Sequence, residues 1–137
     1  MKIFDCFMFY DEELLLDIRL NILDKYVDFF VIVESQFYHN GVKRQLKFDI
    51  KKFNKFKDKI IYIQHKNEPD QIFKLNEKDS EGIKSSKLIH NAHLRENDQR
   101  NHILKGLKKA KNDDLILISD VDEIPNFNSI NLSKIKN

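Results

Sequence analysis

The chain has 137 residues, which suffices for one domain with a buried core and excludes a second domain of ordinary size. Its 24 Lys and Arg residues nearly cancel its 22 Asp and Glu residues, and the resulting net charge of +2 is smaller than a dedicated nucleic-acid-binding protein usually carries. No run approaches the roughly 20 apolar residues that a membrane-spanning helix needs. We therefore expect one domain over residues 1–137, with no nucleic-acid partner and no membrane span.

The first third of the chain predicts a strand, a helix and a second strand. Residues 2–9 are mostly apolar and rich in Phe, as in a buried strand. Between residues 11 and 26, apolar side chains recur at helical spacing behind three acidic residues, which favour a helix N-terminus. Residues 29–34 (FFVIVE) form the continuous apolar run of a strand covered on both faces. This order of elements predicts a parallel crossover unit.

Two residues in these elements have expected roles in the core. Cys6 is the only cysteine, so it cannot form an internal disulfide, and we expect it to be a small core residue in a reducing compartment. The N-terminus leads straight into the first strand without the pattern of a signal peptide, which also favours a cytoplasmic location. Arg19 lies within the apolar helix face and is expected to pair with Asp5 or Asp17.

The middle of the chain has weaker patterns. Residues 35–44 contain an Asn-Gly turn pair and predict a loop after the second strand. Residues 49–56 place Ile and Phe on one helical face, and residues 60–64 predict a short third strand. Residues 66–86 are polar, include Pro and Gly as breakers, and predict a long mobile connection.

The last third of the chain predicts a second long helix over residues 96–110 and a fourth strand over residues 115–119 (LILIS). The helix side chains expected to face the core are Ile103, Leu104, Leu107 and Ala110. Strands joined by helical crossovers predict an α/β fold, with an open, mostly parallel, Rossmann-like sheet and flanking helices.

Two acidic residues directly follow the fourth strand. Ligands of open parallel sheets bind beyond the carboxyl ends of the strands, which is where Asp120 and Asp122 stand. In an extended segment, residues two apart point the same way, so both carboxylates can face one hard divalent cation. Such a cation keeps open positions for diphosphate oxygens and neutralises the charge that grows on a leaving diphosphate. The pair therefore predicts a metal site for a nucleotide-sugar donor.

Two other interpretations of this pair are open. Asp120 and Asp122 can cap a turn after the strand, with Glu123 at the surface. An Asp-x-Asp sequence after a strand is also typical of phosphohydrolases, which would make Asp120 a nucleophile. Those proteins carry the motif on their first strand, whereas here it follows the last predicted strand.

Five blocks of the sequence resemble, in family order, glycosyltransferase family 17, the family of the bisecting β-1,4-mannosyl-glycoprotein N-acetylglucosaminyltransferase. The blocks are Lys2–Glu12 (KIFDCFMFYDE), Asp17–Leu23 (DIRLNIL), Val27–Ser35 (VDFFVIVES), Arg100-Asn101 and Asp113–Pro125 (DDLILISDVDEIP). The last block is the most specific.

This resemblance implies a GT-A fold, a donor of the UDP-N-acetylglucosamine type, a glycan acceptor, and inverting transfer with a divalent metal, manganese or else magnesium. It places Asp120 and Asp122 on the positions that face metal and donor, and Arg100 on the arginine that precedes them in the helix. Glu34 ends the second strand, where such folds contact the nucleoside. Together with right-handed crossovers, the resemblance places the first strand between the second and the fourth.

Two of these residues have structural alternatives. Arg100 can contact donor phosphates or pair with Glu96 one helical turn away, and Glu34 can contact a ribose or serve only as a turn acceptor. Three histidines lack a spacing that would place three ligands on one metal, and we expect them at the surface or in loops: His90, His93 and His102.

Relatives are expected to continue well beyond Pro125, whereas 12 residues follow it here. The chain would then correspond to the donor-binding N-terminal part of the family, without the part that supplies acceptor contacts and the general base, so no catalytic residue is assigned. One alternative function is a non-catalytic nucleotide-sugar-binding module that works with a partner chain. Another possibility is that a carboxylate of the polar stretch, Glu77, Asp79 or Glu81, replaces the missing base.

Overall fold

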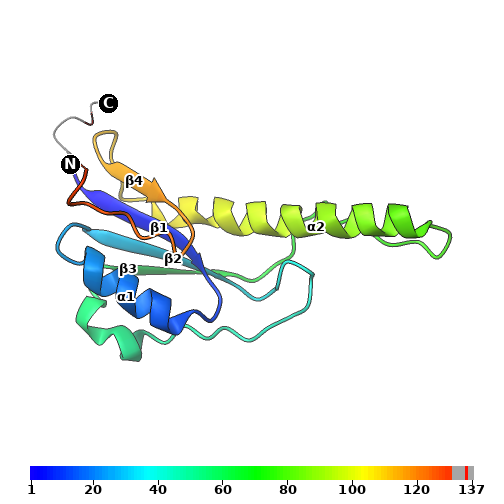
Figure 1. Ribbon diagram of the computed structural model, residues 1–137, viewed down its shortest axis with the longest axis horizontal. Helices are drawn as coiled ribbons and strands as arrows, with labels where there is room; N and C mark the ends of the chain where they lie inside the picture. Colours follow the sequence, from blue (N-terminus) through cyan, green and yellow to red (C-terminus); the bar gives the residue numbers. More distant parts are fainter. Residues whose placement is uncertain (131–134, 136–137) are drawn as a thin grey trace.

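The computed structural model describes residues 1–130 and residue 135, and it consists of one four-stranded sheet with helices on both faces (Figure 1). The strands are β1 (Ile3–Phe9), β2 (Phe29–Ser35), β3 (Ile60–His65) and β4 (Leu115–Ile118). The helices are α1 (Glu13–Leu23) and α2 (Glu81–Asn101), and the 3-10 segments are η1 (Ile50–Phe56) and η2 (His102–Gly106).

The sheet has the order β3-β2-β1-β4, and every pair of neighbouring strands is parallel. This confirms the four predicted strands and the position of β1 between β2 and β4. Parallel neighbours need crossover connections, and the chain supplies them through α1, η1 and the α2–η2 unit. The carboxyl ends of all four strands therefore meet at one edge of the sheet, which is the edge where ligands of such folds bind.

Side chains of β1 alternate between two apolar clusters. Ile3, Phe7 and Phe9 pack with the buried side chains of α1 and η1 on one face. Phe4 and Cys6 point to the other face, where they pack with Ile103 of η2. Because the period of a strand is two residues, a sheet covered on both sides needs the continuous apolar runs that β1 and β2 carry.

Cys6 is fully buried, as expected for a core residue, and the structure supports a test of its reactivity. Burial, together with the Asp5 carboxylate, raises the pKa of the thiol from 9.0 to about 12. This rise lowers the thiolate fraction at pH 8 about a thousandfold, and the thiolate is the reactive form. We expect Cys6 of the native protein to resist an aromatic disulfide reagent and to react fully in guanidinium chloride. Rapid stoichiometric labelling of the native chain would contradict this placement.

The second long helix differs most from its predicted bounds. The prediction was residues 96–110, whereas α2 begins at Glu81, is capped by the Ser80 hydroxyl, and ends at Asn101. The following residues form η2. Within the segment predicted to face the core, Ile103 is buried but Leu104 is 70% exposed, because the 3-10 winding changes which side chains face the sheet.

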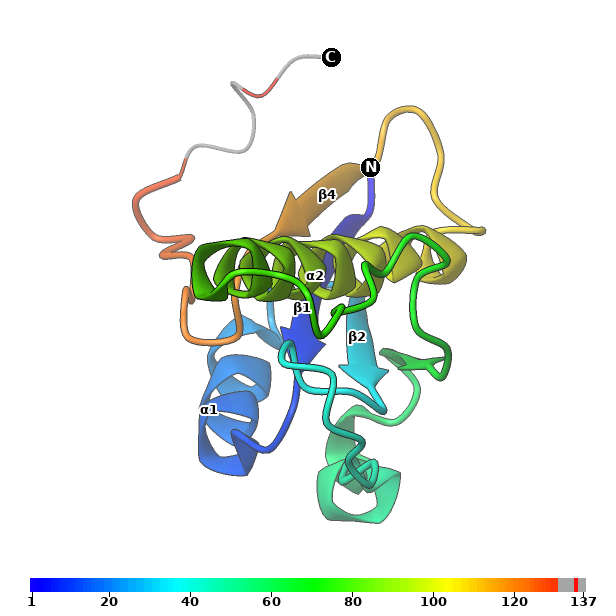
Figure 2. The same cartoon turned by 90° about the vertical axis from the view of Figure 1, so that its right-hand side faces the viewer.

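The first turns of α2 project beyond the carboxyl ends of the strands (Figure 1), and Figure 2 looks toward this projecting end. Ile83, Leu88 and Ile89 are exposed there. The predicted mobile connection over residues 66–86 is therefore wrong in two respects: its last residues are helical, and its residue Phe73 pairs with Asn91 through both backbone groups. Among the described residues, no helix is long and apolar enough to cross a membrane.

The segment predicted as a helix over residues 49–56 is the 3-10 segment η1, with non-helical backbone angles at Phe53. Phe53 and Phe56 are buried as the spacing predicted, whereas Ile50 is 40% exposed. The predicted loop after β2 is confirmed. Its Gly41 has a φ of 87°, and a Cβ atom there would lie 2.6 Å from the Arg95 guanidinium, so this turn requires glycine.

Candidate active site

β4 ends in a tight turn that contains the acidic pair. The Asp120 carbonyl accepts a hydrogen bond from the Glu123 amide at 3.0 Å, and the Glu123 carboxylate accepts one from the Asp120 amide at 3.1 Å. The segment is therefore not the extended one from which we inferred that Asp120 and Asp122 point the same way. Of these three side chains it is Glu123 that caps the turn, which leaves the other two carboxylates free of that role.

Both carboxylates nevertheless line one cavity of about 310 Å³ at the carboxyl ends of β1 and β4. Its lining residues are Met8, Tyr10, Glu12, Leu15, His39, Glu96, Asp120, Val121 and Asp122. The Asp120 side chain is 56% exposed, and Asp122 is exposed and forms no side-chain hydrogen bond or ion pair with any described residue. Two accessible carboxylates at the edge of a ligand-sized cavity are available to a cation or a polar ligand.

Arg19 holds the turn from inside the protein. Its guanidinium is fully buried and forms a two-pronged ion pair with Asp5, at 2.7 and 2.8 Å, which confirms one of its two expected partners. The same guanidinium donates to the carbonyls of Asp120 at 2.7 Å, Val121 at 3.1 Å and Glu123 at 3.1 Å. One buried side chain thus fixes the backbone that carries the acidic pair. Sequence reasoning missed this role because the partners lie about a hundred residues away.

Arg100 lies beside the acidic pair. Its guanidinium is 3.4 Å from the Asp120 carboxylate and 3.1 Å from the Glu96 carboxylate one turn earlier on α2. The structure therefore brings Arg100 and Asp120 together and also forms the expected pair with Glu96. The Arg100 side chain is 39% exposed, so it can reach a ligand in the cavity or in the solvent beside it.

Glu34 is separate from this group and does not line the cavity. It is fully buried, and its carboxylate pairs with Arg44 at 3.0 Å. It accepts hydrogen bonds from the Lys47 amide at 2.7 Å, the Phe48 amide at 3.0 Å and the Tyr62 hydroxyl at 2.7 Å. These contacts make Glu34 the anchor of the loop that connects β2 to η1.

Two aromatic residues of the cavity were not singled out from the sequence. Tyr10 directly follows β1, and its ring lies 5.4 Å from that of His39, which belongs to the loop after β2. Burial raises the pKa of the Tyr10 hydroxyl above its usual range, and this hydroxyl donates to Gln99. His39 Nε2 is buried and has no hydrogen-bond partner among the described residues. The signal that could have found both residues is their position just after strands that end at the ligand-binding edge.

The fold and the cavity define an α/β protein with a polar ligand site at the carboxyl edge of a parallel sheet. The chain belongs to glycosyltransferase family 17, whose family model matches residues 1–137, the whole chain. This confirms the resemblance found in the sequence and supports glycosyl transfer, the activity of the family, which implies a nucleotide-sugar donor and a glycan acceptor. Comparisons with curated proteins and with solved structures gave no match.

Proposed function

We propose that the chain is the donor-binding part of a GT-A glycosyltransferase that moves N-acetylglucosamine, or a related sugar, from a UDP donor to a glycan hydroxyl. The observation that carries this proposal is the cavity at the carboxyl edge of the sheet, which Asp120 and Asp122 line and beside which Arg100 contacts Asp120. Family membership supports glycosyl transfer over phosphate-ester hydrolysis with Asp120 as the nucleophile.

The residues present fit a hard divalent cation, preferably manganese. Asp120 and Asp122 offer carboxylate oxygens, the ligands that such cations prefer, and both side chains are accessible from the cavity. Asp120 and Asp122 would hold the cation, which would supply positive charge to the donor diphosphate. The Arg100 guanidinium, which lies 3.4 Å from the Asp120 carboxylate and is 39% exposed, could bind a phosphate oxygen beside it. Tyr10 and His39 also line this cavity, so their rings could pack against the nucleoside.

The positions of Asp79 and Glu81 decide whether either carboxylate could be the general base that activates the acceptor hydroxyl. Asp79 pairs with Lys87 at 2.6 Å near the projecting end of α2, and Glu81 begins that helix. About 28 Å of helix separate Glu81 from Arg100 at the cavity. The carboxylates that do line the cavity besides the acidic pair are Glu12 and Glu96, and these are the better candidates for the general base.

The donor site is tested by calorimetry of UDP binding with manganese, with magnesium and with a chelator. We expect UDP to bind when a divalent metal is present, and Asp122→Asn to lower that affinity about tenfold or more because it removes a charged ligand. Asp120→Asn should act in the same direction but more weakly. Both variants should remain folded, since their side chains are exposed. The matched control is Asp113→Asn, which removes an exposed carboxylate just before β4.

Unchanged metal-dependent UDP binding in both variants would contradict a metal-binding role of Asp120 and Asp122. Incubation with UDP-N-acetylglucosamine, manganese and mannose-containing acceptors then distinguishes two functions. One is an enzyme that transfers the sugar, and the other is a binding module that needs a partner chain. The binding module predicts UDP affinity with slow donor hydrolysis or no transfer. Release of phosphate from a simple phosphomonoester, without any UDP-sugar, would instead support the phosphohydrolase.

A further inference from the structure

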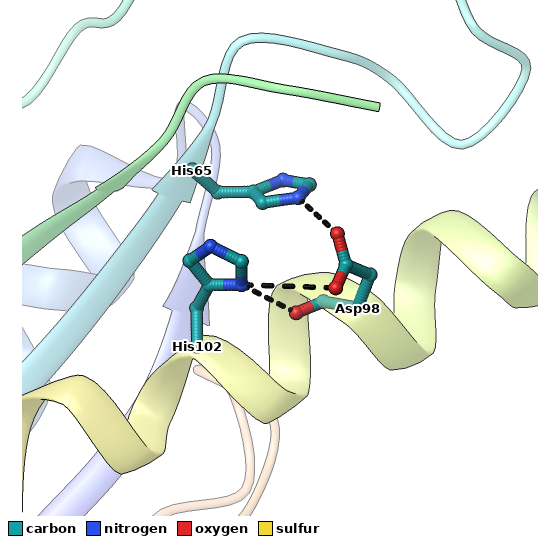
Figure 3. A group of neighbouring side chains, drawn as sticks. All are labelled: His65, Asp98 and His102. Carbon is teal, nitrogen blue, oxygen red and sulfur yellow. Dashed lines mark hydrogen bonds and ion pairs between the residues drawn. The ribbon is translucent and has the colours of Figure 1, made fainter. Parts of the chain in front are cut away.

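A second group of side chains that can bind a metal lies where the end of β3 meets the junction of α2 and η2 (Figure 3). It consists of His65 at the end of β3, Asp98 on α2, and His102 one turn later at the start of η2. The ligand atoms of the three residues lie within 4.8 Å of one another. The surface position expected for His102 is wrong, because its side chain is only 17% exposed and its ring lies 4.4 Å from that of His65.

The two shortest contacts of this group centre on Asp98. Its carboxylate lies 2.7 Å from His65 Nε2 and 3.9 Å from His102 Nδ1, and its backbone carbonyl lies 2.8 Å from the same His102 nitrogen. Residues four apart on a helix share one face, so Asp98 and His102 approach His65 from the same side. Two imidazoles and one carboxylate thus converge from two elements that the sheet packing holds in place.

Ser35 orients the His65 ring through Nδ1, the ring nitrogen that does not contact Asp98. The Ser35 hydroxyl lies 2.9 Å from His65 Nδ1 and accepts a hydrogen bond from the Phe37 amide. A hydroxyl can donate one hydrogen bond and accept two. When an ion binds, the imidazole can therefore carry its proton on Nδ1, donate a hydrogen bond to Ser35, and offer the Nε2 lone pair to the ion. A hydrogen bond at the far ring nitrogen is the usual support of a metal-bound histidine. Ser35 itself is buried, so its hydroxyl serves the ring and does not face the solvent.

The group opens on a cavity of about 410 Å³ that shares no lining residue with the cavity at the acidic pair. Asp98 and His102 line it, together with Glu68 and Asp70 from the loop after β3. Lys105 is the one lysine or arginine side chain in its lining among the described residues, against three carboxylates, of which Glu68 pairs with Arg95 at 2.7 Å. A cation can therefore enter from this side, and water can fill the remaining coordination positions.

We propose that His65, Asp98 and His102 bind one divalent transition-metal ion, such as Zn²⁺, at a site separate from the donor cavity. Mixed imidazole and carboxylate ligands suit such ions, whereas the oxygen-only pair Asp120 and Asp122 suits manganese or magnesium. Three protein ligands complete a tetrahedral site with one water. On binding, His65 moves the proton that Nε2 donates to Asp98 onto Nδ1, where Ser35 accepts it, and His102 moves its proton from Nδ1 to Nε2, so that each ring offers a lone pair. The ion would join the end of β3 to the junction of α2 and η2.

The test is a titration of the chain, free of any polyhistidine tag, with Co²⁺ followed by Zn²⁺. We expect one equivalent of Co²⁺ to give the visible absorption of a four-coordinate ion, and one equivalent of Zn²⁺ to abolish it. Zn²⁺ should also raise the thermal midpoint of unfolding, because it binds the native state. His102→Ala should weaken Co²⁺ binding more than about tenfold, since loss of a ligand costs more than loss of an outer partner.

The controls separate this site from others. Asp98→Asn is a second ligand variant in case His102→Ala destabilises the fold, and circular dichroism without metal reports folding. His93→Gln changes an exposed histidine of the same helix and should bind Co²⁺ as the parent chain does. The double variant Asp120→Asn, Asp122→Asn should keep the Co²⁺ spectrum while it loses manganese-dependent UDP binding. Absence of the spectrum in the parent chain, or an equal loss in His93→Gln, would overturn the proposal.

Discussion

Replacing Arg19 by methionine is expected to lower the free energy of unfolding by about 3 to 5 kcal/mol and to abolish metal-dependent binding of UDP. The substitution leaves the Asp5 carboxylate buried without its partner and removes the donor from three backbone carbonyls in the turn of the acidic pair. Chemical denaturation measures the first effect and calorimetry the second. Lys52→Met is the matched control, because the ion pair of Lys52 with Glu13 is half exposed and should matter little.

A double variant separates stability from positioning. Asp5→Leu combined with Arg19→Met replaces the whole buried pair by apolar side chains, and such replacements often restore stability. The carbonyls of Asp120, Val121 and Glu123 would still lack their donor. We therefore expect stability to recover in part while UDP affinity stays low. Parent-like affinity in the double variant would show that Arg19 supports the fold without positioning the turn.

The substitution Glu34→Ala is expected to lower the free energy of unfolding by a similar amount, about 3 to 5 kcal/mol, because it leaves the buried Arg44 guanidinium without its carboxylate partner. It also removes the acceptor of two backbone amides and of the Tyr62 hydroxyl. Denaturant unfolding measures the change. Glu13→Ala, which removes a half-exposed carboxylate from α1, should have little effect.

This experiment also tests the nucleoside contact proposed for Glu34 from the sequence. Glu34→Gln keeps the shape of the side chain and one acceptor oxygen, so it should retain more stability than Glu34→Ala. If Glu34 acts through the loop it anchors, stability and UDP affinity should fall together across the two variants. Parent-like stability with lost UDP affinity would instead identify Glu34 as a donor ligand.

Local patterns sufficed to predict the sheet but not the reach of α2. The four strands are apolar runs bounded by polar turns, and a sheet covered on both faces requires such runs. The first turns of α2 face the solvent and therefore lack the apolar periodicity on which a helix is usually recognised. A capping signal was present at Ser80 and Glu81, but Gly82 and the surrounding polar residues obscured it.

The candidate site was also predictable only in part, because some of its contacts join segments that are far apart in the sequence. Asp120 and Asp122 directly follow a strand, which local rules describe, whereas the role of Arg100 was implied only by the family resemblance. The structure places Arg100 next to Asp120. The carbonyl partners of Arg19, and the contact between the rings of His65 and His102, depend on which distant segments the crossovers bring together. No spacing along the chain encodes such meetings.

The position of β4 in the sheet has a consequence for the order in which a ribosome-bound chain can fold. β1, α1, β2 and β3 are made first and can pair with one another, but one edge of β1 stays open until β4 has left the ribosome. The hydrogen bonds from the Arg19 guanidinium also form late, because the carbonyls that accept them lie about 100 residues downstream. The turn that carries Asp120 and Asp122 is therefore the last part of the sheet edge to assemble during vectorial synthesis, and a nascent chain acquires the cavity beside this turn only after the rest of the sheet exists.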